Sequence, residues 1–435
     1  MSWRNEYKAK LCSPEEAAKT IKSGDRVFSV SYAPFALVNA IGERYNELED
    51  VWMVGDSYDQ PVNFYTPERM NGHFHRICTF YRNYEREAKK NGCDITAAIV
   101  QYHKQHDFYT NIVKPNVALL NVSPPDENGY CSLGLSPVDV EYVLPTAKVV
   151  IGQINKYVPR ICSDHGYVHV SDMTHIIEHD EPLASFPTSM PSEVDKALAA
   201  HIVDRIPNGA CIQLGIGAAP NAVGYSLGNH RDLGIHSEMY VEAMMYLTKN
   251  GAVSNSRKAL YRGQSVFGFG SGSQELYDFM DNNYKVFCKP MEWITSPFTI
   301  AQIDNFVSIN TCFGTDVLGQ ISSESLGYTH YSGIGGQLDF VRGAQYSKGG
   351  MSFLAFRSTS TKRDGTVISK VVFNHSIGTA ISTPRTDVQF IATEYGIADI
   401  QHQPIDERVK RIIAVAHPDF RDELMFQAKK HSLII

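Results

Sequence analysis

Hydrophobic residues along the chain gather in short runs, and polar or turn-rich stretches separate them. Runs rich in β-branched and aromatic residues predict strands. In the first half these runs are residues 26–31, 51–54, 95–100, 117–122 and 148–154. In the second half they are residues 210–215, 239–242, 266–269, 286–288, 307–309 and 388–393. Because helical stretches alternate with the runs, we predict an α/β fold with mostly parallel sheets.

Helix and linker signals divide this pattern into two parts. Ser13-Pro14-Glu15-Glu16 has the form of a capping box and predicts a helix that continues past Ile21. Residues 177–192 contain three prolines and few periodic apolar positions, which is typical of a surface linker, and a helix is predicted from Glu193 to Ile206. A chain of 435 residues is also long for one core. We therefore predict two related open α/β domains, residues 1–190 and 191–435.

A repeated segment supports the idea of related domains. Gly24 precedes one predicted strand and Gly209 another, and a leucine follows each glycine after the same interval, at Leu48 and Leu233. Continued at this spacing, Met53 in the first copy takes the place of Glu238 in the second. Only the second copy then has a carboxylate there, which makes Glu238 a candidate nucleophile or general base. A solvated surface glutamate is the plain alternative.

Composition and charge narrow the classes of function. The chain is 43% hydrophobic and 20% charged, with a net charge of −7. These values are typical of a soluble globular protein and argue against nucleic acid or an anionic membrane as the main partner. No leader segment or membrane-length apolar run occurs, and the eight cysteines form no C-x-x-C pair. We expect a cytoplasmic protein without a metal site or disulfides.

The sharpest local motif is the stretch from Gln213 to Asn221. A predicted strand ends in Gly215-Ile216-Gly217-Ala218-Ala219, and Pro220 suits the first turn of a helix whose free N–H groups could receive a phosphate or an oxyanion. It fails the dinucleotide fingerprint, because Pro220 takes the place of the third glycine.

Other motifs have weaker meaning. Ser226 matches a nucleophile-elbow pattern, but a predicted helix precedes it, so a surface serine is favoured. Two histidine pairs lack a third metal ligand: His73 with His75, and His103 with His106.

A second glycine-rich loop lies at 333–336. Gly335 and Gly336 could turn backbone amides toward a ligand, Gln337 could donate from its side chain, and a strand-like apolar run follows. A tight turn alone is the alternative. Further along, Lys362 could meet a phosphate, although a solvated basic face is the common meaning of such a lysine.

Taken together, these motifs resemble the acetyl-CoA hydrolase/transferase family of CoA-transferases, most of all its butyryl-CoA:acetate and 4-hydroxybutyrate members. The resemblance covers nearly the whole chain. The segments that carry it are residues 3–8, 123–129, 215–221, 234–239, 333–344, 393–396 and 416–421. Two segments depart from the family pattern, at 242–245 and at 401–403.

The resemblance implies a function and a site. Glu238 would become a covalent glutamyl-CoA thioester as CoA passes between a short-chain acyl-CoA and an acid such as acetate. CoA would be a substrate and covalent intermediate rather than a tightly bound cofactor. The residues expected to contact CoA are Gly215, Ile216, Gly217, Ala218, Ala219, Gly335, Gly336, Gln337 and Lys362.

Further expectations concern the domains, the assembly and rival functions. The first domain would shape the acid pocket, with Tyr32, Ala33, Pro34 and Phe35 as candidates, and the second would carry Glu238. A homo-oligomer is expected, either a dimer or a dimer of dimers. The alternatives are an acyl-CoA hydrolase that uses the same glutamate and a non-catalytic ligand-binding protein on the same fold.

Overall fold

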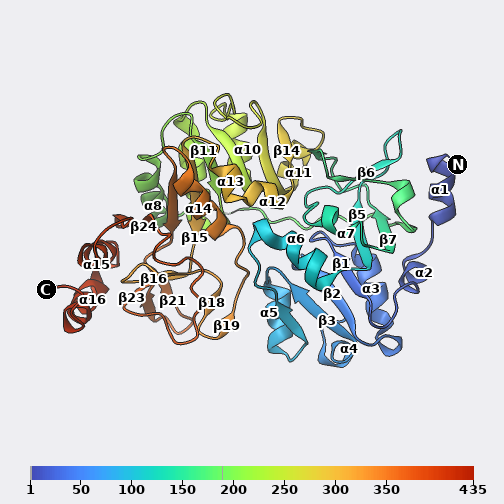
Figure 1. Cartoon of the computed structure of the whole chain (residues 1–435), viewed down its shortest axis with the longest axis horizontal. Coiled ribbons are helices and arrows are strands. Elements are labelled where there is room, and N and C mark those ends of the chain that lie inside the picture. The colour runs from blue at the N-terminus through green and yellow to red at the C-terminus, as the bar shows by residue number, and fades with distance from the viewer. Residues whose placement is uncertain (1, 189) are drawn as a thin grey trace. The chain divides into compact units, whose positions relative to one another are not determined.

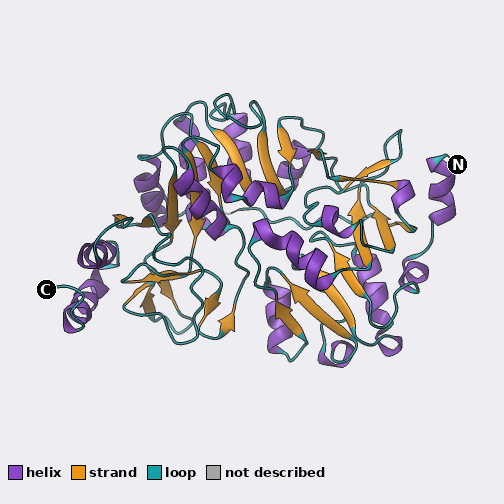
Figure 2. Ribbon diagram, in the orientation of Figure 1, coloured by secondary structure: helices purple, strands orange, loops and turns teal. Residues whose placement is uncertain are grey.

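The computed structural model describes residues 2–188 and 190–435. The chain forms two compact units, each described here by itself. The first comprises Met1–Phe186 and Phe267–Trp293, and the second comprises Pro187–Val266 and Ile294–Ile435. In each unit helices pack beside the strands of a sheet, as the colours of Figure 1 and Figure 2 show.

The first unit contains a sheet of seven strands, ordered β10-β7-β5-β1-β2-β3-β4. Every neighbouring pair in it is parallel, which confirms the predicted sheet type. The strands are β1 (Arg26–Ser29), β2 (Val51–Gly55), β3 (Phe74–Cys78), β4 (Ile95–Ala97), β5 (Val117–Val122), β7 (Val149–Ile154) and β10 (His175–Glu178). Hydrophobic clusters cover both faces of this sheet, which is the usual arrangement for parallel strands.

Helices of the first unit follow the predicted signals in part. Ser13 and Glu16 form the expected capping box, with N–H to oxygen distances of 3.2 and 3.0 Å. The helix ends at Ala18, earlier than predicted. The helices are α1 (Trp3–Lys10), α2 (Pro14–Ala18), α3 (Phe35–Glu43), α4 (Pro67–Met70), α5 (Asn83–Lys90), α6 (Gln105–Asp107), α7 (Val140–Val143) and α11 (Gln274–Met280), with a π-helical turn at Phe108–Val113. The first unit also contains two pairs of short strands: β6 (Tyr130–Ser132) with β9 (Tyr167–His169), and β8 (Cys162–Ser163) with β14 (Val286–Cys288).

The second unit has its own sheet, in which the order β25-β24-β20-β15-β11-β12 occurs. All of these pairs are parallel except the edge pair of β24 and β25. The strands are β11 (Cys211–Leu214), β12 (Gly234–Tyr240), β15 (Phe306–Thr311), β20 (Met351–Ala355), β24 (Phe390–Thr393) and β25 (Gly396–Asp399). Strand β13 (Ser265–Gly270) runs across the boundary between the two units.

Two predictions for this unit were wrong. The strand predicted at 239–242 begins at Gly234 instead, so Glu238 lies inside it. The apolar run after Gly336 forms the helix α14 (Gln337–Tyr346), not a strand. Most of α14 is buried, and a short apolar run that is buried on all sides gives no periodicity that separates helix from strand.

The remaining helices of the second unit surround its sheet and its C-terminal end. They are α8 (Glu193–Val203), α9 (Ala218–Ser226), α10 (Glu242–Lys249), α13 (Pro297–Ile300), α15 (Ile405–Ala414) and α16 (Pro418–Lys430), while α12 (Met291–Thr295) crosses the unit boundary. Small strands form hairpins or a three-stranded ladder: β16 (Gly314–Asp316), β17 (Ile321–Ser322), β18 (Ser325–Leu326), β19 (Thr329–His330), β21 (Thr359–Thr361), β22 (Val367–Ser369) and β23 (Val371–Val372). A hydrophobic cluster joins α15 and α16 to this part of the unit.

The two units repeat one strand order, which agrees with the repeat in the sequence. The order β10-β7-β5-β1-β2 in the first matches β24-β20-β15-β11-β12 in the second. The register differs from the sequence spacing, however. Val27 pairs with Met53, 26 positions later, whereas Ile212 pairs with Ile235, 23 positions later. This pairing aligns Met53 with Ile235, so three residues further along both strands Asp56 corresponds to Glu238. The predicted equivalence of Met53 with Glu238 was therefore wrong.

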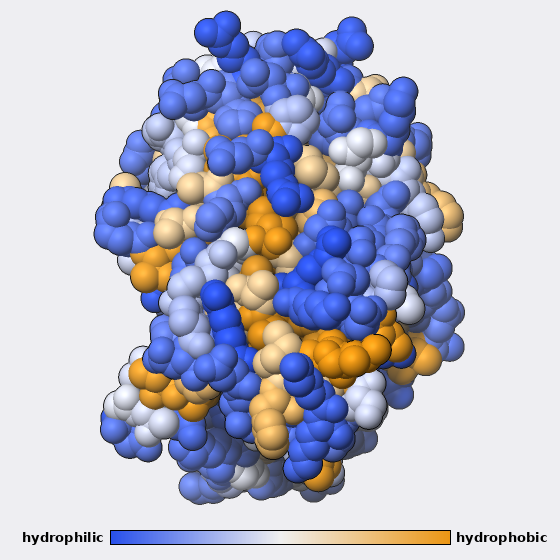
Figure 3. All heavy atoms as spheres, turned by 90° about the vertical axis from the view of Figure 1, so that its left-hand side faces the viewer, coloured by the Kyte–Doolittle hydropathy of each residue, from blue (hydrophilic) through white to orange (hydrophobic). Residues whose placement is uncertain are grey.

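The surface in Figure 3 is mainly hydrophilic, with hydrophobic residues gathered in patches. Across the described residues, helices are too short or too polar to cross a membrane.

Candidate functional site

The order of strands in the second unit reverses its direction at β11. The chain passes from β11 to β12 on one side, and later returns to β15 on the other side of β11. In open α/β sheets such a reversal of strand order leaves a crevice at the carboxyl ends of the strands, where ligands bind. The loops after β11 and β15 are therefore the first place to look for a site.

The glycine loop predicted from the sequence lies at this point. Gly215 follows β11 and its N–H donates to the carbonyl of Ile309 over 2.8 Å. Gly217 has φ of +127°, a value that favours glycine, and is the N-cap of α9 without a side-chain cap. Ile216, Gly217 and Ala218 are exposed, whereas Ala219 is buried. The predicted helix start after the loop is therefore present, and its N–H groups have no side-chain cap, which is the kind of helix start that can receive an anion.

Glu238 lies in β12 and is half-buried. Its Oε2 accepts a hydrogen bond of 2.7 Å from the backbone N–H of Gly336, the N-cap of α14. A Cβ added to Gly336 would overlap Oε2, and one added to Gly335 would lie 3.8 Å from Oε1. The second glycine loop thus fits closely around the carboxylate, which brings together two segments that the sequence picked out separately.

Two buried basic side chains lie near the first residues of β12: His236 is part of the strand, and Lys258 comes from the loop between α10 and β13. His236 is fully buried, and its Nε2 lies 2.8 Å from the carbonyl of Ile294. Burial, together with the nearby Lys258 ammonium, lowers the pKa of His236 to about 3. Lys258 donates to the carbonyls of Ile235 and Gln264 over 2.8 and 2.7 Å, and burial lowers its pKa to about 8. His236 is therefore neutral at pH 7.

The other two predicted residues have different surroundings. Gln337 is the first residue of α14, and its side-chain Nε2 donates to Thr383 Oγ1 over 3.0 Å. One of the two N–H donors of this amide therefore bonds within the protein, and a contact between Gln337 and CoA stays a prediction. Lys362 lies on the exposed turn between β21 and β22.

Sequence reasoning missed Asn310 and Thr311 at the end of β15. A Cβ on Gly215 would lie 2.7 Å from Asn310 Oδ1, and one on Gly217 would lie 2.7 Å from Thr311 Oγ1. Both glycines are therefore required by these neighbours. The available signal was the alternation of Ser308 and Asn310 within an otherwise apolar run, since polar residues are uncommon inside a buried parallel strand.

The competing motifs do not form a site. Ser226 is an exposed residue at the end of α9, as expected for a surface serine. His75 contacts Asp50 and Asp94, and His106 contacts Glu292. Searching the described residues for groups of three or more metal-ligating side chains finds none.

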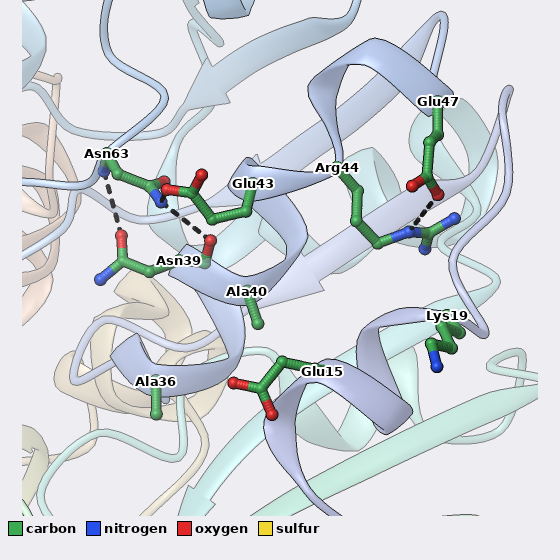
Figure 4. Close-up of a pocket in the computed structure, with 9 residues that line it drawn as sticks. All are labelled: Glu15, Lys19, Ala36, Asn39, Ala40, Glu43, Arg44, Glu47 and Asn63. Atoms are coloured by element: carbon green, nitrogen blue, oxygen red, sulfur yellow. Dashed lines mark hydrogen bonds and ion pairs between the residues drawn. The ribbon is translucent and has the colours of Figure 1, made fainter.

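A hollow of about 420 Å³ lies between α2 and α3 of the first unit (Figure 4). Some of its polar groups pair with one another: Arg44 contacts Glu47, and the Asn63 amide donates to Glu43. It also lies along the helices rather than at the carboxyl ends of the strands. This hollow therefore lacks the position at the strand ends that the Gly215 loop has in the second unit.

Comparison with known proteins agrees with this geometry. The acetyl-CoA hydrolase/transferase N-terminal domain matches residues 1–187, and the C-terminal domain of the same family matches residues 272–428. The chain is 38% identical to the 4-hydroxybutyrate coenzyme A transferase of Clostridium kluyveri, covering 99% of this chain and 100% of that one. It is 36% identical to the butyryl-CoA:acetate CoA-transferase of Anaerostipes caccae, covering 99% and 98%.

A solved structure gives the same result. RipA from Yersinia pestis is 34% identical and aligns over the full length of both chains with a TM-score of 0.92. The fold, the glycine loop at Gly335 and Gly336 beside Glu238, and these full-length matches agree, and the chain belongs to the acetyl-CoA hydrolase/transferase family.

Proposed function

We propose that this protein is a CoA-transferase that moves CoA from a short-chain acyl-CoA, of the butyryl or 4-hydroxybutyryl type, to a carboxylate such as acetate. Glu238 is the covalent carrier. The observation that carries the proposal is the hydrogen bond from Gly336 N–H to Glu238 Oε2, in the unit that also contains the Gly215 loop. The names of the relatives support the substrate class.

The first half-reaction makes an enzyme thioester. A Glu238 oxygen attacks the acyl-CoA carbonyl, the C–S bond breaks, and CoA leaves as a thiolate beside a mixed anhydride. The thiolate then attacks the glutamyl carbonyl, and the anhydride C–O bond breaks to release the first acid as a carboxylate. The charge that develops on the glutamyl oxygen is near the Gly336 N–H, and a well-aimed donor of this kind contributes about 3–4 kcal/mol.

The second half-reaction reverses these bonds with the acceptor acid. The acceptor carboxylate attacks the glutamyl thioester and releases CoA thiolate, which then attacks the acyl carbonyl of the new anhydride. New acyl-CoA leaves and the Glu238 carboxylate is restored. Neither half-reaction consumes water or a net proton, and His236, which is neutral and lies two residues before Glu238 in β12, adds no positive charge near the carboxylate.

The remaining roles belong to the same proposal. Gly215, Ile216, Gly217, Ala218 and Ala219 line the thiol arm of CoA, and Gly335 with Gly336 donate near the thioester. The backbone N–H of Gln337 adds to the same helix start, and Lys362 meets a CoA phosphate. Residues 191–435 carry the chemistry, and residues 1–190 select the acid through Tyr32 to Phe35. The protein acts in the cytoplasm as a homo-oligomer, either a dimer or a dimer of dimers.

Trapping the intermediate tests the proposal. Wild-type protein mixed with acyl-CoA alone is expected to gain the mass of CoA less one water, and peptide mapping should place it on Glu238. Glu238→Gln is expected to lack the adduct and to lose transferase activity by about a thousandfold or more. Glu242→Gln is the matched control, because Glu242 lies four positions later and starts α10. The Glu242→Gln variant should keep both the CoA adduct and the transferase activity.

The rival functions give different results. A hydrolase would release free CoA from acyl-CoA at the same rate with or without an acceptor acid. A non-catalytic binding protein would show no adduct and no turnover. Its Glu238→Gln variant would bind acyl-CoA as well as wild type does. Either result would overturn the transferase.

A further inference from the structure

Two buried amide side chains join β11 to β15 below the glycine loop. Gln213 Nε2 donates to Asn310 Oδ1, and Asn310 Nδ2 donates to Gln213 Oε1, both over 3.2 Å. Gln213 is 1% exposed and Asn310 is 6% exposed. Each amide therefore uses the other as both donor and acceptor, and the pair connects the two strands at the point where the strand order reverses.

The amide pair determines which type of residue fits at position 215, where the loop begins. The register pairs Leu214 with Ile309, so Gly215 lies beside Asn310. Asn310 Oδ1 occupies space only 2.7 Å from where a Cβ of Gly215 would be. Its amide therefore lies over the Cα of Gly215, and Gln213 holds the amide in that orientation. The next residue, Thr311, fills the corresponding space at Gly217.

The first unit shows what this position looks like without such a loop. The pairing of β1 with β5 in the first unit can be aligned with the pairing of β11 with β15 in the second. In this alignment Phe28 corresponds to Gln213, Leu120 to Asn310 and Val30 to Gly215. All three are buried and apolar. Packing of these strands therefore does not require amides, and burying them has a desolvation cost that an apolar pair avoids. The amide pair occurs in the unit that also has the glycine loop.

We propose that Gln213 and Asn310 are positioning residues for the CoA-binding loop Gly215–Ala219. By fixing Asn310 over Gly215, the pair sets the path of the backbone into α9 and so the place where the sulfur-bearing arm of CoA lies. The two residues act through the loop and do not take part in bond making. This inference rests on the proposed transferase function and adds to it the part of the sheet that orients the loop.

The first test replaces both amides with apolar side chains of similar size, in the double variant Gln213→Met/Asn310→Leu. It is expected to remain folded, with a Tm close to that of wild type. Its KM for acyl-CoA and its Kd for free CoA should rise between about 10-fold and 100-fold, because a small misplacement of a bound group has effects of this size. The KM for the acceptor acid should not change. Leu120→Met is the control, since it alters the equivalent layer of the first unit and should leave both KM values unchanged.

A double-mutant cycle then asks whether the residues act as a pair. Gln213→Ala and Asn310→Ala should each raise the Kd for CoA nearly as much as the double alanine variant does. If the apolar double variant fails to fold, Asn310→Asp gives the same test, because a carboxylate of the same shape cannot donate to Gln213 Oε1.

The outcomes separate the two proposals. Unchanged Kd and KM for CoA in folded variants would overturn the positioning role while leaving the transferase proposal untouched. A uniform loss of kcat with unchanged CoA affinity would also overturn it. If wild-type protein neither binds free CoA nor transfers it, the proposed function itself fails.

Discussion

The backbone N–H of Gly336 and the carboxylate of Glu238 are 98 positions apart in sequence, yet they form a 2.7 Å hydrogen bond. The N–H belongs to the residue that caps α14, and the carboxylate projects from the middle of β12. A helix start favours negative charge, so the resting carboxylate is held at a position where an oxyanion would also be stabilised.

This closeness predicts a strong effect of a single methyl group. In Gly336→Ala the new Cβ overlaps Glu238 Oε2, so the carboxylate must leave its position. Transferase kcat should fall about 100-fold to 1,000-fold, which is the effect of losing one oxyanion donor. Gly251→Asn is the matched control: asparagine tolerates a positive φ such as the +84° of this exposed turn, and a Cβ there meets nothing within 4 Å. Equal activity of the two variants in a steady-state assay would contradict the prediction.

Acid sensitivity is predicted from His236. Its pKa is about 3 in the folded protein because of burial and then Lys258, whereas an unfolded histidine has a pKa near 6.5. The unfolded chain therefore binds a proton first, and stability that is present above pH 6.5 is lost as the pH falls toward 3. The slope from this group reaches about 1.4 kcal/mol per pH unit.

Urea unfolding between pH 7 and 4 measures this dependence. His236→Gln should show a shallower fall of the unfolding free energy than wild type across that range. His179→Gln is the control because His179 is exposed. A wild-type slope in both variants would show that His236 does not stay neutral.

The opposite sign is predicted for Asp59 in the first unit. Burial raises its pKa to about 7, and the paired Arg82 opposes this shift only in part. Asp59 also lines a small cavity with Tyr32 and Asn121. The folded protein holds the proton more tightly, so the contribution of this group is greatest below pH 3.8 and is lost as the pH rises through about 7.

Comparison of wild type with Asp59→Asn isolates the contribution of Asp59 to the free energy of unfolding. The unfolding free energy of wild type minus that of the variant should decrease between pH 4 and 7, with little further change above pH 8. Asp204→Asn, an exposed carboxylate at the end of α8, should give a constant difference. A difference that increases with pH would mean that Arg82 dominates and the pKa of Asp59 is lowered.

Much of the fold could be predicted because parallel strands are buried on both faces and appear as apolar runs. Residues 117–122 and 286–288 were predicted with the observed ends. The helix start at Pro14 and the glycine loop after β11 followed from local rules for caps and turns. Glu238 was found from a repeat and from family resemblance.

Other features depend on partners that are distant in sequence. The strand around Glu238 was predicted too short, because His236 and Ser237 are polar yet fully buried. Spacing alone aligned Met53 with Glu238, but a connection of different length shifts the ladder by three positions and brings Asp56 there. Asn310 could not be recognised without Gln213, since the pair exists only once β11 and β15 lie side by side.

The position of Glu238 within a β-strand has a kinetic consequence. A carboxylate on a flexible loop could move between separate binding sites for donor and acceptor, but the backbone of Glu238 is fixed within β12 by its sheet. The donor acyl group and the acceptor acid must then occupy the same binding site in turn. A high concentration of acceptor should therefore exclude the acyl-CoA that has to come first, so the enzyme would be slowed by an excess of its own second substrate.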